Sequence, residues 1–73
     1  MMATREEADQ AFRQYAGPEL KAGTYALIDG GGGRWLVTRR GGPLAVDSEG
    51  HVRPVGEVFT SDEYSRIAAA WAF

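Results

Sequence analysis

The chain has no cysteine, one histidine and one lysine among its 73 residues. Without cysteine it forms neither a disulfide nor a thiolate metal site, which fits a reducing cytoplasm. No apolar run approaches the roughly 20 residues needed to cross a bilayer, and the charged start "MMATREEADQ" lacks the apolar stretch of a signal peptide. We therefore expect one small cytoplasmic domain, residues 1–73, that does not associate with a membrane.

The net charge of −2 is too small to indicate binding to nucleic acid or to a membrane surface. The charges are unevenly placed, because residues 34–53 carry four arginines and both ends are acidic. A chain of this length buries only a modest core, so a dimer interface would add stability. Trp71 and Phe73 lie near the C-terminal end, where we expect them to pack on this domain or on a neighbour.

The sequence predicts a first helix over about residues 5–16. Thr4 and Glu7 have the spacing of a capping box, in which each side chain binds the backbone N–H of the other residue. Gly17 and Pro18 end the helix, because glycine adopts the left-handed conformation and proline cannot continue a helix. The apolar stripe expected to face the core consists of Ala8, Ala11, Phe12 and Tyr15.

The same signals predict a second helix over about residues 61–71. Thr60 and Glu63 have the spacing of a second capping box, and Phe59 stands where it can pack on Tyr64 as a hydrophobic staple. The apolar stripe expected on this helix consists of Tyr64, Ile67, Ala68 and Trp71.

Between the two helices the apolar period changes to two residues, which indicates β-strands. The connecting segments are short and contain glycine, so they fit hairpin loops, and glycines 30–33 would make a flexible tip. Consecutive hairpins produce an antiparallel meander, and Pro54 in its last strand fits an edge position. The strands are expected at about residues 24–29, 34–40, 43–47 and 51–55.

The turns also predict which side chains share a face of the sheet. The loops are taken to be closed by the pairs Asp29–Arg34, Arg40–Pro43 and Asp47–His51. The three pairs agree in placing apolar side chains on one face, which is good evidence for a four-stranded meander. That face consists of Ala26, Ile28, Trp35, Val37, Leu44, Val46 and Val52. The expected fold is therefore α+β in the order α-β-β-β-β-α, a four-stranded antiparallel meander with two helices packed on one face.

The opposite face of the predicted sheet combines apolar and basic side chains. One interpretation is that its leucines are ordinary exposed hydrophobic residues. Another is that it forms a partner-binding face for another protein or for a second copy of the chain. A third is that its arginines and tyrosine bind single-stranded nucleic acid, although the acidic helices and the scarcity of lysine argue against this. The candidate residues are Tyr25, Leu27, Arg34, Leu36, Arg40 and Arg53.

No catalytic or cofactor-binding motif is recognisable in the sequence. Glycines 30–33 lead into a strand, whereas a phosphate-binding loop leads into a helix, so they indicate a hairpin tip. His51 has only Asp47 and Glu49 nearby, and Asp47 is expected to bind backbone N–H groups of its own turn. We therefore expect no catalytic residues, no cofactor and no metal site.

The segment "GGPLAVDSEGHVRPVGEVFTSDEYSRI", residues 41–67, resembles the C-terminal half of the YrhB-like immunity-protein family of bacterial polymorphic toxin systems. A first helix followed by a strand pair agrees with that family in order, whereas the stretch before the motif is shorter here than is usual in the family. The resemblance implies a small bacterial protein that binds and neutralises a cognate toxin and performs no chemistry of its own. The matching positions are Pro43, Leu44, Val46, Asp47, Gly50, Val52, Gly56, Glu63, Tyr64 and Ile67.

The function expected from these observations is non-enzymatic protein–protein binding, in its most concrete form as an immunity-type protein that neutralises a toxin. Two alternatives remain open, namely a small nucleic-acid-binding domain that uses the arginine-bearing sheet face and a homodimeric accessory protein.

Overall fold

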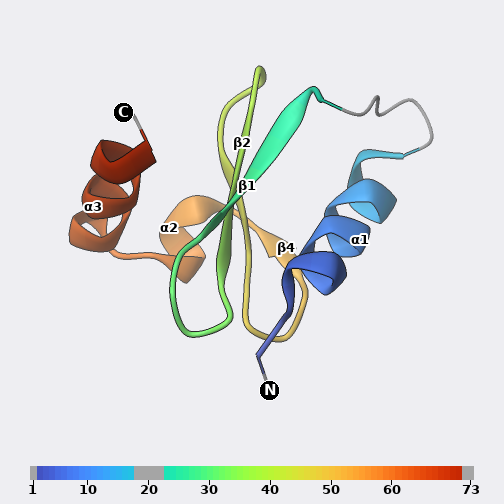
Figure 1. Cartoon of the computed structure of the whole chain (residues 1–73), viewed down its shortest axis with the longest axis horizontal. Coiled ribbons are helices and arrows are strands. Elements are labelled where there is room, and N and C mark those ends of the chain that lie inside the picture. Colours follow the sequence, from blue (N-terminus) through green and yellow to red (C-terminus); the bar gives the residue numbers. More distant parts are fainter. Residues whose placement is uncertain (1, 18–22, 72–73) are drawn as a thin grey trace.

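The computed structural model describes residues 2–17 and 23–71. The strands form one antiparallel sheet in the order β1-β2-β3-β4. The predicted α+β meander is therefore confirmed (Figure 1), with α2 as an additional element that was not predicted. In chain order the elements are α1 (Arg5–Ala16), β1 (Tyr25–Asp29), β2 (Trp35–Arg39), β3 (Leu44–Val46), β4 (Val52–Arg53), α2 (Val55–Val58) and α3 (Ser61–Trp71).

Both predicted capping boxes are present. At the start of α1 the Thr4 N–H donates to Glu7 Oε1 at 2.9 Å, and the Glu7 N–H donates to Thr4 Oγ1 at 3.2 Å. At the start of α3 the Thr60 N–H donates to Glu63 Oε1 at 2.9 Å, and the Glu63 N–H donates to Thr60 Oγ1 at 3.1 Å. These local bonds pair N–H groups that have no partner within the helix, so they fix where each helix begins.

The C-terminal ends of the helices agree with the prediction only in part. Gly17 follows α1 with a positive φ of 88°, which favours glycine, but its ψ of −178° is not that of the predicted left-handed conformation. Pro18 and Phe73 lie outside the described residues. Trp71, the last residue of α3, is 55% exposed, so its side chain is not buried within this domain.

The register of the β1–β2 hairpin differs from the prediction by one residue. Gly30, not Asp29, pairs with Arg34, because the Gly30 N–H donates to the Arg34 carbonyl at 2.9 Å. The loop therefore consists of residues 31–33, which all have positive φ, and Asp29 pairs with Trp35. Since successive side chains alternate between the faces of a strand, the shift exchanges the two faces of β1.

The other two hairpins keep the predicted faces. In the β2–β3 pair Val37 lies opposite Leu44 and not opposite Val46, a shift of two residues that leaves every side chain on its predicted face. In the β3–β4 pair Val46 lies opposite Val52, as predicted. The error in the predicted faces of the sheet is thus confined to β1.

The helices cover both faces of the sheet, and the prediction that they share one face is wrong. Figure 1 shows α1 on one side of the sheet and α2 and α3 on the other. The strands are apolar on both faces, which is typical of a sheet that is buried on both sides. The core under α1 consists of Ala8, Phe12, Leu27, Val37 and Val46. The core on the other face consists of Leu36, Ala45 and Phe59, with Ile28, Val55, Val58, Tyr64 and Ile67 packed against it.

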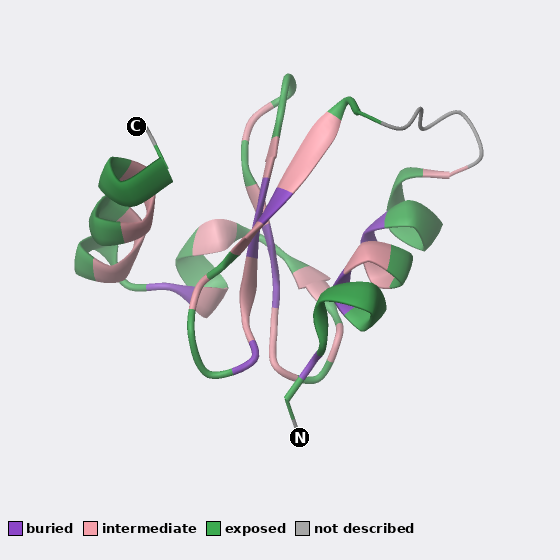
Figure 2. Ribbon diagram, viewed as in Figure 1, coloured by how far each residue is buried: buried purple, intermediate pink, exposed green. Residues whose placement is uncertain are grey.

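The two long helices are buried to different extents, as Figure 2 shows by colour. In α1 the predicted burial of the apolar stripe is confirmed for Ala8 and Phe12, which are 0% and 1% exposed. It is wrong for Tyr15, which is 61% exposed. In α3 no residue is fully buried. The first helix therefore closes its core more completely than the last one does.

Glycine at the hairpin tip allows two distant segments to approach it. The Phe59 ring lies against Gly30 so closely that any side chain there would overlap the ring. Met2 passes Gly33, where an added methyl group would lie 2.6 Å from the Met2 Cβ. The tip, expected from sequence to be flexible, is therefore packed against chain segments from both helical layers.

Replacing Leu36 with alanine tests the two-core arrangement. Leu36 is 2% exposed in the core under α2 and α3, so Leu36→Ala should lower the free energy of unfolding by about 2–5 kcal/mol. Urea denaturation followed by circular dichroism measures this. Gln14→Ala on the exposed surface of α1 is the control and should change it by less than about 0.5 kcal/mol. A loss below about 1 kcal/mol for Leu36→Ala would contradict the arrangement.

Two glycines of the loop form a matched pair for testing the packed tip. Gly31 and Gly33 have φ values of 83° and 77°, but only Gly33 has neighbours that an added methyl group would meet. Gly31→Ala should cost about 1 kcal/mol of stability from backbone strain alone. Gly33→Ala should cost a further ~1–3 kcal/mol because Met2 must move. Equal losses for the two variants in urea denaturation would show that the tip is not packed.

Candidate functional site

The residues predicted to form one contact face do not share a face in the structure. The side chains of Tyr25 and Leu27 pack on the α1 side of the sheet, whereas Leu36 belongs to the core on the opposite side. Leu27 and Leu36 are also buried, at 8% and 2% exposure. The predicted surface is therefore wrong, because the one-residue shift in β1 separates its members.

Arg34 has a structural position at the hairpin tip. Its Nη2 donates to Glu63 Oε2 at 2.7 Å, its Nη1 to the Val58 carbonyl at 3.0 Å and its Nε to the Gly31 carbonyl at 3.0 Å. Its guanidinium also lies 4.8 Å from the centroid of the Phe59 ring. Arg34 thus joins the hairpin to the α2–α3 connection and is not available to a partner.

The remaining predicted arginines lie apart from each other. Arg40 is exposed in the turn between β2 and β3. Arg53 Nε donates to Asp47 Oδ2 at 2.9 Å, while Asp47 Oδ1 accepts from the N–H groups of Glu49 and His51 at 3.0 and 2.9 Å. The predicted role of Asp47 in its own turn is confirmed. Within residues 2–17 and 23–71, no group of three or more histidine, cysteine or acidic side chains is placed to hold a metal ion.

The Arg34–Glu63 ion pair makes stability depend on pH. The hydrogen bond from Arg34, followed by that from the Thr60 N–H, lowers the pKa of Glu63 from 4.5 to about 2. Because the pKa of Glu63 is lower in the folded state than in the unfolded state, the ion pair stabilises the folded domain fully above about pH 4.5. This stabilisation disappears as the pH falls toward 2.

Glu63→Gln should therefore destabilise the domain above about pH 4.5 and have progressively less effect down to about pH 2. Urea denaturation at a series of pH values measures the difference from the wild type. Asp62→Asn removes a neighbouring exposed carboxylate and is the control. A stability difference that stays constant between pH 4.5 and 2 would exclude the ion pair as its source.

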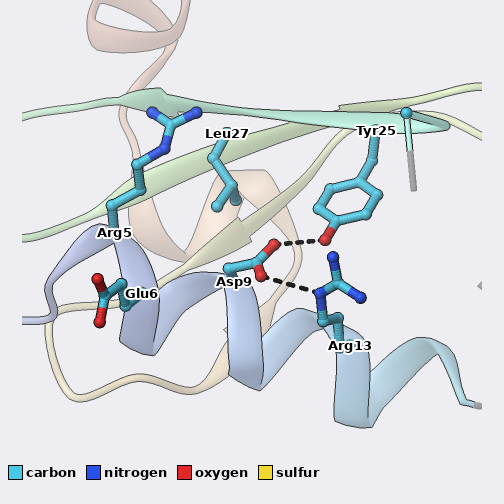
Figure 3. Close-up of a pocket in the computed structure, with 7 residues that line it drawn as sticks. Arg5, Glu6, Asp9, Arg13, Tyr25 and Leu27 are labelled. Carbon is cyan, nitrogen blue, oxygen red and sulfur yellow. Dashed lines mark hydrogen bonds and ion pairs between the residues drawn. The ribbon is translucent and has the colours of Figure 1, made fainter. Parts of the chain in front are cut away.

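A cleft of about 330 Å³ lies between α1 and the edge strand β1 (Figure 3). Its walls are formed by one side of α1 and by the β1 side chains that face this helix, so they combine charged, aromatic and apolar groups. The lining contains no serine, cysteine or histidine. The lining residues are Arg5, Glu6, Asp9, Arg13, Gly23, Tyr25 and Leu27.

Asp9 connects α1 to the edge strand β1, and both of its carboxylate oxygens accept hydrogen bonds. One of its carboxylate oxygens accepts from the Tyr25 hydroxyl, and the other accepts from Arg13 Nε at 2.9 Å. The Tyr25 hydroxyl, and to a lesser extent Arg13, lowers the pKa of Asp9, which keeps the carboxylate ionised. The Tyr25 ring packs on Phe12 with centroids 4.9 Å apart. The charge of Arg13 is therefore balanced within the cleft.

Arg5 is the cation of the cleft that has no ion-pair partner among the described residues. Its guanidinium lies 5.9 Å from the centroid of the Trp35 ring. Figure 3 shows it beside Leu27 at the level of β1, while the carboxylate of Glu6 points away from the strand. Arg5 therefore presents positive charge at the edge of the sheet.

The edge of β1 presents backbone groups that do not bond to β2. In an antiparallel pair, residues alternate between bonding to the partner strand and pointing away from it. Since Gly30 bonds to Arg34, the N–H and C=O groups of Tyr25, Leu27 and Asp29 point away from β2. They lie along the mouth of the cleft, because Tyr25 and Leu27 also line it.

One contact of this site could be expected from the sequence. Asp9 and Arg13 stand four residues apart on one helix, a spacing that allows an ion pair. Their contact with β1 could not be recognised, because the predicted register turned Tyr25 away from α1. No sequence feature indicated a binding role for Arg5, since an arginine in a first helical turn is usually solvated.

Searches against protein-family models, curated proteins and solved structures each return no match for this chain. Among the described residues, no helix has the length and apolarity that crossing a bilayer requires.

Proposed function

We propose that the chain is a non-enzymatic protein-binding domain whose partner adds an extended segment to the edge of β1. The observation that carries this proposal is the open edge of β1 itself. Outward-pointing N–H and C=O groups at Tyr25, Leu27 and Asp29 form a template for a further strand. The cleft under α1 lies beside this template and offers side-chain contacts to the added segment.

The two edges of the sheet support this choice by their difference. β4 is two residues long and is followed at once by Pro54, which has no N–H to donate. β1 is five residues long and mostly apolar, "YALID", and contains no lysine or proline. Proteins commonly protect an edge with such residues or with a bulge, and β1 has the regular pairing of an unmodified strand. An edge strand without these protections favours the binding of a partner strand.

A more specific form of the proposal is an immunity-type protein that neutralises a bacterial toxin, and it rests on the resemblance of residues 41–67 to the YrhB-like family. Most residues of that motif lie in β3, its turn and α3, where they serve the fold. The toxin would then contact the β1 edge, outside the motif. Co-expression with the product of the adjacent gene tests this form, because that product should be toxic alone and harmless with this chain.

Nucleic-acid binding through an arginine-bearing sheet face has less support. Arg34 and Arg53 are engaged in ion pairs, and helices lie on both faces of the sheet. A mobility shift at low salt that weakens steeply as salt is added would revive this alternative.

A proline substitution at the end of β1 tests the proposed strand addition. Asp29→Pro removes one outward N–H while leaving the bonds to β2 intact, and Asp29→Ala removes the same side chain but keeps the N–H. Peptides selected by the wild type from a displayed library of random nine-residue sequences should bind Asp29→Ala and bind Asp29→Pro at least about tenfold more weakly.

Equal binding to the two variants, or selection of no peptide at all, would overturn the proposal. Sedimentation equilibrium gives a further check. A wild-type dimer that Asp29→Pro converts to a monomer would assign the edge to a second copy of the chain, and the proposal of a separate partner would be wrong.

A further inference from the structure

A second hollow lies on the other side of the same edge strand. It has a volume of about 300 Å³ and is situated between the end of α3 and the ends of β1 and β2. Its lining residues are Gly23, Thr24, Tyr25, Ala26, Thr38, Arg39 and Trp71. Gly23 and Tyr25 also line the cleft under α1, so the two hollows meet at β1.

The two hollows differ in chemistry. The cleft under α1 contains the unpaired cation Arg5 near Leu27. The hollow beside α3 contains Ala26 and Trp71 together with two threonines and Arg39, whose guanidinium lies against Gly41 in the β2–β3 turn. Trp71 is 55% exposed, which leaves much of a large aromatic side chain without cover. A strand bound at the edge would therefore have the Arg5 guanidinium near one face and the exposed Trp71 ring near the other.

An added strand would distribute its side chains between the hollows in a fixed way. Leu27 points its backbone groups outward, so in an antiparallel addition the partner residue bonded to it places its side chain on the α1 face, near Arg5. The next partner residue lies opposite Ala26 and places its side chain on the other face, toward Trp71. Adjacent residues of the partner thus meet Arg5 on one face and Trp71 on the other.

We infer that the partner segment is an extended stretch in which an acidic residue stands next to a large apolar one. The acidic side chain pairs with Arg5, and the apolar side chain covers Trp71. This inference rests on the proposed function and adds the partner's chemistry to it. The charge of Arg13 does not compete for the acidic residue, because Asp9 already neutralises it at 2.9 Å.

Peptide selection with a charge-reversed variant tests the pairing. Wild type, Arg5→Glu and Arg66→Glu are each used to select from a displayed library of random nine-residue peptides. Arg66 is exposed on α3 and lines neither hollow, so its reversal is the control. Wild type and Arg66→Glu should enrich peptides with aspartate or glutamate beside a large apolar residue. Arg5→Glu should enrich lysine or arginine at that position.

Fluorescence anisotropy with synthetic copies of the enriched peptide measures how much each contact contributes to binding affinity. Arg5→Gln and Trp71→Ala should each weaken binding about tenfold, and Arg66→Gln should leave it unchanged. Both substituted side chains are exposed, so the variants should unfold at the wild-type urea concentration.

The outcomes separate this inference from the proposed function. Enrichment of peptides without an acidic position, or the same peptides from wild type and Arg5→Glu, overturns the inference and leaves strand addition standing. Loss of binding in Arg5→Gln but not in Trp71→Ala overturns the apolar half alone. No enrichment with any of the proteins overturns both the inference and the proposed function.

Discussion

The pairing of Gly30 with Arg34 determines which side chains of β1 enter each of the two cores. Because the β1–β2 loop contains residues 31–33 only, Leu27 faces α1 and Ile28 faces the opposite core. The same pairing directs the backbone of Leu27 outward at the edge of the sheet. Both cores and the candidate binding edge therefore depend on the length of one loop, which a single added residue would change.

The parts of the fold that depend on local chemistry could be predicted from the sequence. The capping boxes at Thr4 and Thr60, the strand count and the β3–β4 register follow from residue types only a few positions apart. The β1 register could not be predicted, since a run of glycines accommodates a three-residue or a four-residue loop equally well. α2 was missed because its four residues are too few to display a helical period.

The candidate site could not be predicted because it is made by packing and not by a motif. Its central contact joins Asp9 of α1 to Tyr25 of β1, sixteen residues later in the chain. Assigning Tyr25 to the wrong face removed that contact and led to a surface that included the buried Leu36. The proposal of a protein-binding role keeps Tyr25 and Leu27, which now act through the open edge of β1, and leaves out Arg34, Leu36, Arg40 and Arg53.

The hairpin tip has a consequence for how the domain folds. The two cores lie on opposite faces of a thin sheet, and such layers can in principle unfold separately. Here Phe59 from the second core rests on Gly30, while Met2, which precedes α1, rests on Gly33. Opening either layer therefore removes one of the two contacts that hold the same turn. Slowly exchanging amide hydrogens on both sides of the sheet should accordingly be released together, as one cooperative unit, even though the two cores share no side chain.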